Sequence, residues 1–176
     1  MGEDIKLKSL DKLTIPSLIK FQAKNLSSKP ALISNNEVLS FADLDSLSTN
    51  LATHLMHLGM LSGDRAAIWA PNMNEWVLAA IAIHKAGGVL VPINTRMKAK
   101  EASYILNNSE AKFLFSVKTF LGTDYFELLE KEDLPHLLHQ ISLDESKSNE
   151  LNQSFHSLKE QALYVELPEV SETDMA

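Results

Sequence analysis

Residues 65–94 read RAAIWAPNMNEWVLAAIAIHKAGGVLVPIN and follow the pattern strand, helix, strand. A short apolar run at 65–70 predicts a buried strand, and Asn72 and Glu75 stand at the spacing of a capping box that would start a helix at 73–86. The continuous β-branched run at 89–94 predicts a strand covered on both faces. Two strands joined by one helix at such short spacing favour a right-handed crossover and a parallel sheet.

The sequence before this unit predicts two helices separated by a hairpin. Proline at position 16 suits the first turn of a helix, and the stretches 31–34 and 37–41 flank Asn35 and Asn36, which tolerate the positive φ of a tight turn. Ser40 then starts a longer amphipathic helix, with Asp43 at the capping-box position, and Gly59 ends it.

The sequence after this unit continues the alternation. The expected elements are a helix at 98–108, a strand at 111–117, a helix within 119–132, a strand at 138–144 and a polar, partly helical connection at 145–162. The expected fold class is therefore α/β, with a parallel sheet, flanking helices and a small N-terminal hairpin.

Composition limits the classes of function. The 176 residues fit one domain, and a formal charge of -7 argues against a nucleic-acid-binding surface. The chain has no cysteine, which suits a reducing compartment, and its N-terminus lacks the apolar core of a signal peptide, so we expect a cytoplasmic location. The most apolar run, 76–93, is interrupted by charged residues, glycines and proline, and it is not expected to span a membrane.

The paired glycines Gly87 and Gly88 raise the question of a phosphate-binding loop. Such a loop places its glycines after a strand and before a helix, where free N–H groups and the positive end of the helix dipole face the anion. Here the glycines follow a helix and precede a strand. We therefore interpret them as a helix C-cap with a left-handed glycine, and the sequence contains neither G-x-x-x-x-G-K nor G-x-G-x-x-G.

Other candidate groups also favour structural roles. Two pairs of histidines at three-residue spacing, His54 with His57 and His136 with His139, could begin a metal site, but no third ligand can be assigned to either. An acidic run is typical of a solvated helix face, and it contains Glu127, Glu130, Glu132 and Asp133. Asp64 and Arg65 suit a turn and the start of a strand. We assign no catalytic, cofactor-binding or metal-binding residue to this chain.

Residues 40–115 resemble the N-terminal segment of the adenylate-forming, AMP-binding enzymes, especially the acyl-CoA synthetases. The likeness follows the order GD (63–64), PN (71–72), EW (75–76), AGG (86–88), VPIN (91–94), Arg96, YIL (104–106) and S-x-A-K (109–112). It covers residues 16–117 well. It implies a tail at 1–15 and, at 16–176, an incomplete N-terminal α/β subdomain that ends just before the family's phosphate-binding loop.

The resemblance implies a parent enzyme that uses ATP, magnesium and coenzyme A to convert a carboxylic acid, commonly a fatty acid, into an acyl-CoA through an acyl-adenylate. The family's catalytic motifs lie beyond Ala176, so the matching positions receive scaffold roles only and the fragment is expected to be inactive. These positions are Pro71, Asn72, Gly87, Gly88, Pro92, Asn94 and Arg96.

The expected partners are the remainder of the parent polypeptide and a second copy, through an exposed sheet edge or an apolar patch. Peripheral membrane association of the parent stays open. The alternative function is a free-standing interaction or regulatory module of the same ancestry. The codon after that for Ala176 discriminates the two, because a stop codon favours the module.

Overall fold

A five-stranded parallel sheet forms the centre of the protein. The computed structural model describes residues 14–34, 37–144, 153–160 and 163–174. The strand order is β4-β3-β5-β6-β7, and every neighbouring pair is parallel. The strands are β3 (Arg65–Trp69), β4 (Val89–Pro92), β5 (Phe113–Ser116), β6 (His139–Ser142) and β7 (Gln153–Ser154). This confirms the expected α/β class.

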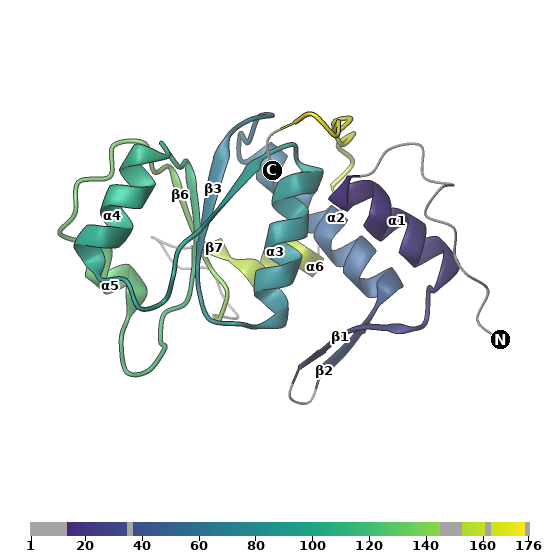
Figure 1. Cartoon of the computed structure of the whole chain (residues 1–176), viewed down its shortest axis with the longest axis horizontal. Coiled ribbons are helices and arrows are strands. Elements are labelled where there is room, and N and C mark those ends of the chain that lie inside the picture. Colours follow the sequence, from purple (N-terminus) through teal and green to yellow (C-terminus); the bar gives the residue numbers. More distant parts are fainter. Residues whose placement is uncertain (1–13, 35–36, 145–152, 161–162, 175–176) are drawn as a thin grey trace.

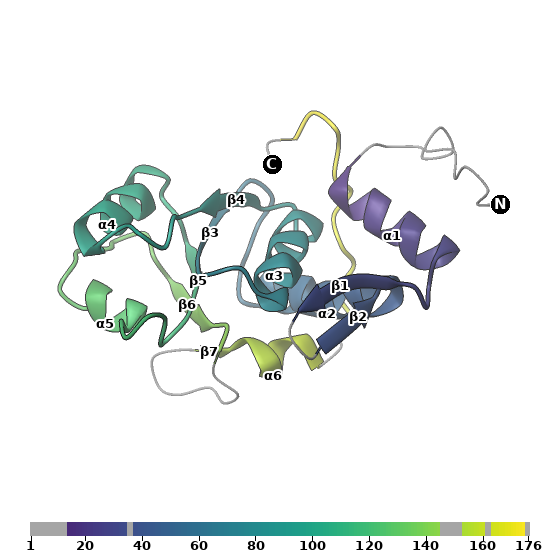
Figure 2. The ribbon, with the colours of Figure 1, turned by 60° about the horizontal axis from the view of Figure 1, so that its bottom comes forward.

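Helices cover both faces of the sheet. Figures 1 and 2 show α4 and α5 on one side and α1, α2 and α3 on the other, with the antiparallel hairpin β1–β2 beneath α2. The hairpin strands are β1 (Pro30–Ser34) and β2 (Glu37–Ser40). The helices are α1 (Ile15–Asn25), α2 (Phe41–His57), α3 (Asn74–Lys85), α4 (Ala99–Asn108), α5 (Tyr125–Leu129) and α6 (Phe155–Glu160).

The core lies where the central strands meet α2 and α3. β5 is buried at every position and β3 at every position but the first, as expected of strands covered on both faces. α3 is buried from Leu78 to its end because it packs against α2 as well as the sheet. The largest fully buried side chains are Trp69, Phe113, Phe115, Phe155, Leu51, Leu55, Ile68, Leu78, Ile83, Leu106, Leu114 and Ile141.

Two helix starts follow the sequence prediction. Ser40 and Asp43 form the expected capping box, in which the Asp43 carboxylate accepts the Ser40 backbone N–H at 2.9 Å. Hydrogen bonds from the Ser40 hydroxyl and backbone lower the pKa of Asp43. α1 starts one residue earlier than the expected domain boundary at 16, with Thr14 as its cap.

The predicted capping box of Asn72 and Glu75 is wrong. α3 begins at Asn74, its N-cap residue is Met73, and no side chain caps it. Pro71 and Asn72 instead continue the chain out of β3 into a loop, and the Asn74 amide donates a hydrogen bond to Glu37 of the hairpin at 2.8 Å. The polar side chain at the helix start is thus used for a tertiary contact.

The predicted helix within 119–132 shortens to α5 at Tyr125–Leu129. Phe120 and Thr123 close a tight turn in which Leu121 and Gly122 have positive φ, and Asp124 caps the helix after it. A chain with two successive left-handed residues cannot continue as a right-handed helix. The predicted strand at 89–94 is shorter, because β4 ends at Pro92, and it is only partly covered: Val89 is buried, Leu90 and Val91 are half-buried and Pro92 is exposed.

Some expectations fall on residues outside those that the structure describes. These are the tail at 1–13, the turn at Asn35 and Asn36, parts of the connection at 145–152 and 161–162, and the last two residues. Within the described part of that connection lie β7 and α6. No helix among the described residues is long and apolar enough to cross a membrane.

Candidate functional site at the carboxyl edge of the sheet

A crevice of about 530 Å³ opens outside the carboxyl ends of β3, β4 and β5. β3 connects through α3 to β4 on one side, whereas β5 leads to β6 on the other, so the chain reverses direction between β3 and β5. Ligands of open α/β sheets bind outside the carboxyl ends of the strands at such a reversal. The crevice is lined by Ala70, Pro71, Asn72, Trp76, Pro92, Ile93, Asn94, Thr95 and Phe120.

Two buried aromatic side chains hold the loop that follows β4. Trp69 donates from Nε1 to the Asn94 carbonyl at 3.1 Å, and the Tyr125 hydroxyl donates to the Thr95 carbonyl at 2.9 Å. The two rings meet edge to face with centroids 4.4 Å apart. Burial raises the pKa of Tyr125, which keeps its hydroxyl protonated as a donor. The loop is therefore fixed before any ligand binds.

The same loop presents polar side chains at the mouth of the crevice. The Asn94 side-chain oxygen accepts the Arg96 backbone N–H at 2.9 Å, and the Met97 N–H donates to the Asn94 carbonyl at 3.0 Å. These bonds form a turn that leaves Asn94 exposed at the crevice, which the exposed Asn72 of the loop after β3 also lines, whereas Arg96 is exposed but outside the lining. The crevice lining offers amide and hydroxyl groups and contains no ionisable side chain for acid–base chemistry.

Gly87 and Gly88 form the predicted helix C-cap. Gly87 has φ +76, its N–H donates to the His84 carbonyl at 3.1 Å, and the Gly88 N–H donates to the Ile83 carbonyl at 2.8 Å. This pair of bonds is the Schellman motif, which satisfies the carbonyls of the last helical turn. The negative end of the α3 dipole lies here, so the site repels an anion. Gly87 and Gly88 lie at the opposite end of α3 from the crevice.

The histidine pairs lie in unlike environments. His54 is buried and His57 exposed on α2, while His139 stacks on Phe113 with ring centroids 4.8 Å apart and His136 is exposed in the preceding loop. The described residues contain no group of three or more histidine, aspartate or glutamate side chains placed to hold a metal ion.

The acidic run is split between solvent and structural contacts. Glu127 and Glu130 are exposed at α5, as expected of a solvated face. Glu132 instead accepts a hydrogen bond from the Ser103 hydroxyl of α4 at 3.0 Å, and the Asp133 backbone carbonyl accepts one from Asn107 at 2.8 Å. The end of the run therefore fastens α5 and its following turn to α4.

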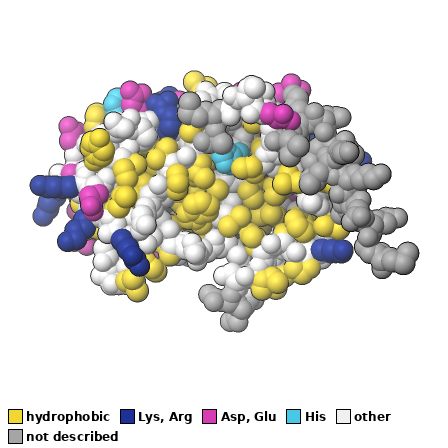
Figure 3. Space-filling view, viewed as in Figure 1, with side chains coloured by type: hydrophobic (Ala, Val, Ile, Leu, Met, Phe, Trp, Pro, Cys, Tyr) yellow, Lys and Arg dark blue, Asp and Glu magenta, His cyan; other side chains and the backbone are white. Residues whose placement is uncertain are grey.

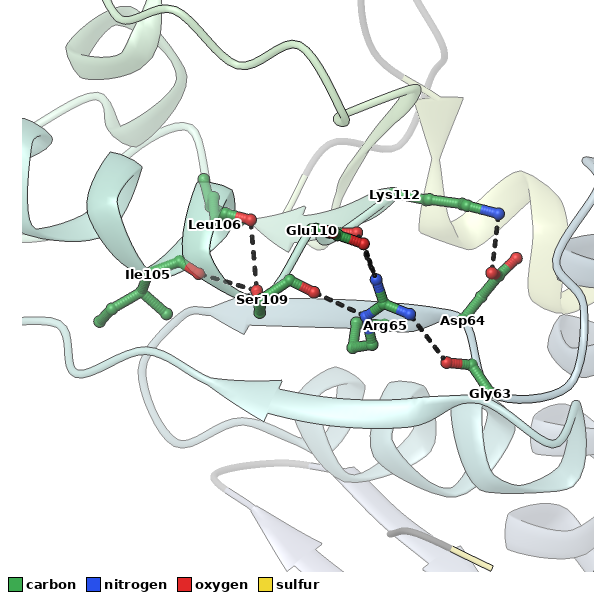
Figure 4. Close-up of polar contacts among 8 residues, drawn as sticks. All are labelled: Gly63, Asp64, Arg65, Ile105, Leu106, Ser109, Glu110 and Lys112. Atoms are coloured by element: carbon green, nitrogen blue, oxygen red, sulfur yellow. Dashed lines mark hydrogen bonds and ion pairs between the residues drawn. The ribbon is translucent and has the colours of Figure 1, made fainter.

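Asp64 and Arg65 do not form a pair with each other (Figure 4). Asp64 receives the Lys112 ammonium at 2.7 Å, and Arg65 contacts the Glu110 carboxylate at 2.8 Å and the Ser109 carbonyl at 2.6 Å. Both interactions join the start of β3 to the turn before β5. The prediction of turn and strand-entry roles agrees with these contacts, which lie at the amino ends of the strands, away from the crevice.

Sequence reasoning missed a buried ion pair between α2 and α3. The Lys85 side chain is 4% exposed, and its ammonium donates to the Asp45 carboxylate at 2.6 Å and to the Thr49 hydroxyl at 2.8 Å. Burial lowers the pKa of Lys85, and the hydrogen bond and charge of Asp45 oppose that shift. The spacing of Asp45 and Thr49, one helical turn apart, is a signal that could have revealed the acceptor pair.

Comparisons with known proteins agree with this geometry. The profile of the family described as AMP-binding enzyme matches residues 19–176. A 3-[(3aS,4S,7aS)-7a-methyl-1,5-dioxo-octahydro-1H-inden-4-yl]propanoyl:CoA ligase of Mycobacterium tuberculosis is 37% identical over 131 residues, which cover 74% of this chain and 26% of that protein. This chain thus spans about a quarter of the length of the curated relatives it matches first.

Solved structures show the same fold. The anthranilate CoA ligase AuaEII, in complex with anthranoyl-AMP, superimposes with a TM-score of 0.82 at 23% identity, over 93% of this chain and 31% of that one. The inhibitor-bound N-terminal domain of FACL13 from Mycobacterium tuberculosis gives a TM-score of 0.73 at 25% identity, over 89% of this chain and 37% of that one. Because the family profile covers the chain from Ile19 onward, the chain belongs to the AMP-binding enzyme family.

Proposed function

We propose that this chain is the N-terminal α/β part of an AMP-forming acyl-CoA ligase. The parent enzyme would join a carboxylic acid, of the fatty-acid type, to coenzyme A with conversion of ATP to AMP and pyrophosphate, and it would act in the cytoplasm. The observation that carries the proposal is the family match over residues 19–176, together with the 37% identity to a CoA ligase over three quarters of the chain.

The described residues do not fit the triphosphate of ATP. The connection from β3 to α3 and that from β4 to α4 contain no glycine, so their backbones lack the close-approach geometry of a phosphate loop. The connection from β5 to α5 contains Gly122, but the Asp124 carboxylate already accepts the N–H groups of Phe126 and Glu127 at the helix start. A second anion there would be repelled by that carboxylate.

The role that fits the chain is a scaffold for the rest of the parent polypeptide. The carboxyl edge combines a fixed crevice with the turn after β5, at whose tip the Leu121 side chain is 88% exposed. Phe120, the residue before Leu121, lines the crevice, so the exposed leucine and the hollow lie at the same edge of the sheet. We therefore place the contact with the downstream polypeptide at this edge of the sheet.

In the absence of that polypeptide, a second copy of the chain would cover part of the apolar surface. Figure 3 shows hydrophobic side chains gathered across the middle of one face. The β4 edge is a poor alternative, because Pro92 has no N–H to donate to an added strand. Self-association through an apolar patch is the form we expect.

A coupled-product assay tests the proposal. The purified chain is incubated with ATP, magnesium, coenzyme A and a panel of fatty and aromatic acids, beside the longer polypeptide translated from the same reading frame. We expect AMP release from the longer polypeptide and none above the blank from this chain. Turnover by the chain alone, or a stop codon directly after Ala176, would contradict it.

A further inference from the structure

A second hollow, here named the α1 groove, lies at the other end of α3 from the crevice. It has a volume of about 840 Å³ and runs between α1, the first half of α2, the end of α3 and the segment 167–170. Figures 1 and 2 both show that C-terminal segment passing beside α1. The 12 residues of α3 separate Lys85, at the groove, from the crevice by roughly 18 Å at the helical rise. The two sites are therefore distinct.

The α1 groove carries two cations that the fold does not use. Lys20 and Lys24 stand one helical turn apart on α1, both are exposed, and neither forms an ion pair or side-chain hydrogen bond with the other described residues. Lys85 at the floor is different, because Asp45 and Thr49 already accept its protons. Lys20 adds an unfavourable like charge near Lys85, which lowers the pKa of that lysine further. An anion beside Lys20 would relieve this repulsion.

Part of the wall of the α1 groove is apolar. Phe21 of α1 and Leu167, Pro168 and Val170 of the C-terminal segment supply this part, while the groove is also lined by Asp45, which pairs with Lys85, and by the exposed Glu169. Side chains four residues apart on a helix have Cβ atoms about 5–6 Å apart, so two lysine ammonium groups can bracket one carboxylate. The volume falls within the range of about 300–1,000 Å³ found for small-molecule sites.

We propose that the α1 groove binds a long-chain alkyl carboxylate, with the carboxylate between Lys20 and Lys24 and the alkyl chain along Phe21, Leu167 and Val170. An inorganic phosphate would gain nothing from the apolar walls, and a neutral alcohol would gain nothing from the lysines. The site does not depend on the proposed ligase activity, since it belongs to surfaces remote from the carboxyl edge.

Isothermal titration of the 176-residue chain with dodecanoate below its micelle concentration tests this site. We expect saturable binding of one molecule per chain, at least about tenfold tighter than dodecan-1-ol. Replacing both exposed lysines, Lys20→Gln with Lys24→Gln, should weaken dodecanoate binding about fivefold, as expected for two solvent-exposed charge contacts. The matched control, Lys98→Gln with Lys100→Gln on the far side of the sheet, should leave the affinity unchanged.

A second measurement locates the ligand. Amide resonances of α1 and of residues 167–170 should shift on titration, while those of the carboxyl-edge loop after β4 should not. Absence of saturable binding, equal affinity for the alcohol, equal affinity in the Lys20 and Lys24 variant, or shifts confined to the carboxyl edge would each overturn the proposal. Both lysines are exposed, so the variant should keep the thermal unfolding midpoint of the unsubstituted chain.

Discussion

The buried pair of Lys85 and Asp45 makes a sharp prediction about stability. The Lys85 side chain is 4% exposed, and replacing Asp45 by alanine leaves its ammonium with only the backbone carbonyl of residue 45 and the Thr49 hydroxyl as acceptors. Removing one partner of a fully buried ion pair costs about 3–5 kcal/mol. The Asp45 side chain is itself 30% exposed and two neutral acceptors stay, so we expect Asp45→Ala to lower the free energy of unfolding by about 2–3 kcal/mol.

The matched variant removes the charge itself. Lys85→Met keeps the length of the side chain and leaves Asp45 with access to water, so its cost should be about 0–1 kcal/mol. Urea unfolding followed by circular dichroism measures both changes, and calorimetry should show a midpoint about 5–10 °C lower for Asp45→Ala. Equal losses in the two variants, or a larger loss in Lys85→Met, would show that an unpaired buried ammonium is not what destabilises Asp45→Ala.

The pH dependence of the unfolding free energy of Asp45→Ala tests the same ion pair in a second way. Burial lowers the pKa of Lys85 in the folded chain below its ordinary value of 10.5, so between those two values the unfolded chain binds more protons. Stability therefore rises with pH across that window. Asp45 opposes the shift, and without it the window extends to lower pH. The stability deficit of Asp45→Ala should accordingly shrink as the pH is raised from neutral toward 10.5.

Further substitutions test the cap, the loop and the free surface. Gly87→Ala should lower the free energy of unfolding in urea by about 2 kcal/mol and Gly59→Ala by about 1 kcal/mol. Both glycines have positive φ, but only at Gly87 would a Cβ lie 3.1 Å from Ser62 Oγ. Equal losses in the two variants would contradict the close approach. Tyr125→Phe should lower the unfolding free energy by about 1 kcal/mol through the lost bond to Thr95, and an unchanged value would argue against a fixed loop. Light scattering should show dimers that dissociate on dilution, and a strict monomer at all concentrations would count against self-association.

Local patterns in the sequence predicted much of the fold. The capping box at Ser40, the glycine that ends α3 and the alternation of apolar strands with helices depend on neighbouring residues, so they can be read from short stretches. The tight turn at Leu121 and Gly122 was missed although Gly122 and the N-cap residue Asp124 are local signals of a break and a helix start; only the positive φ of Leu121 has no signal in the sequence. The edge position of β4 depends on strand order, which no short stretch contains.

The candidate site depends on tertiary contacts that the sequence could not predict. Trp69 and Tyr125 lie 56 positions apart, and only the sheet brings their donors to the adjacent carbonyls of Asn94 and Thr95. Asn72 was expected to cap a helix and instead borders the crevice, because the helix starts at Asn74, one residue later than predicted. The resemblance correctly identified the family, whereas the crevice and the α1 groove form between segments that are distant in the sequence and could not be predicted from it.

We propose that this chain supplies a scaffold and that its described residues form no site for the nucleotide. Calorimetric titration of the purified chain with magnesium ATP tests it most directly, because a phosphate loop would give saturable heat whatever the acid substrate. We expect only heats of dilution up to millimolar ATP. Stoichiometric, saturable uptake of the nucleotide would contradict it.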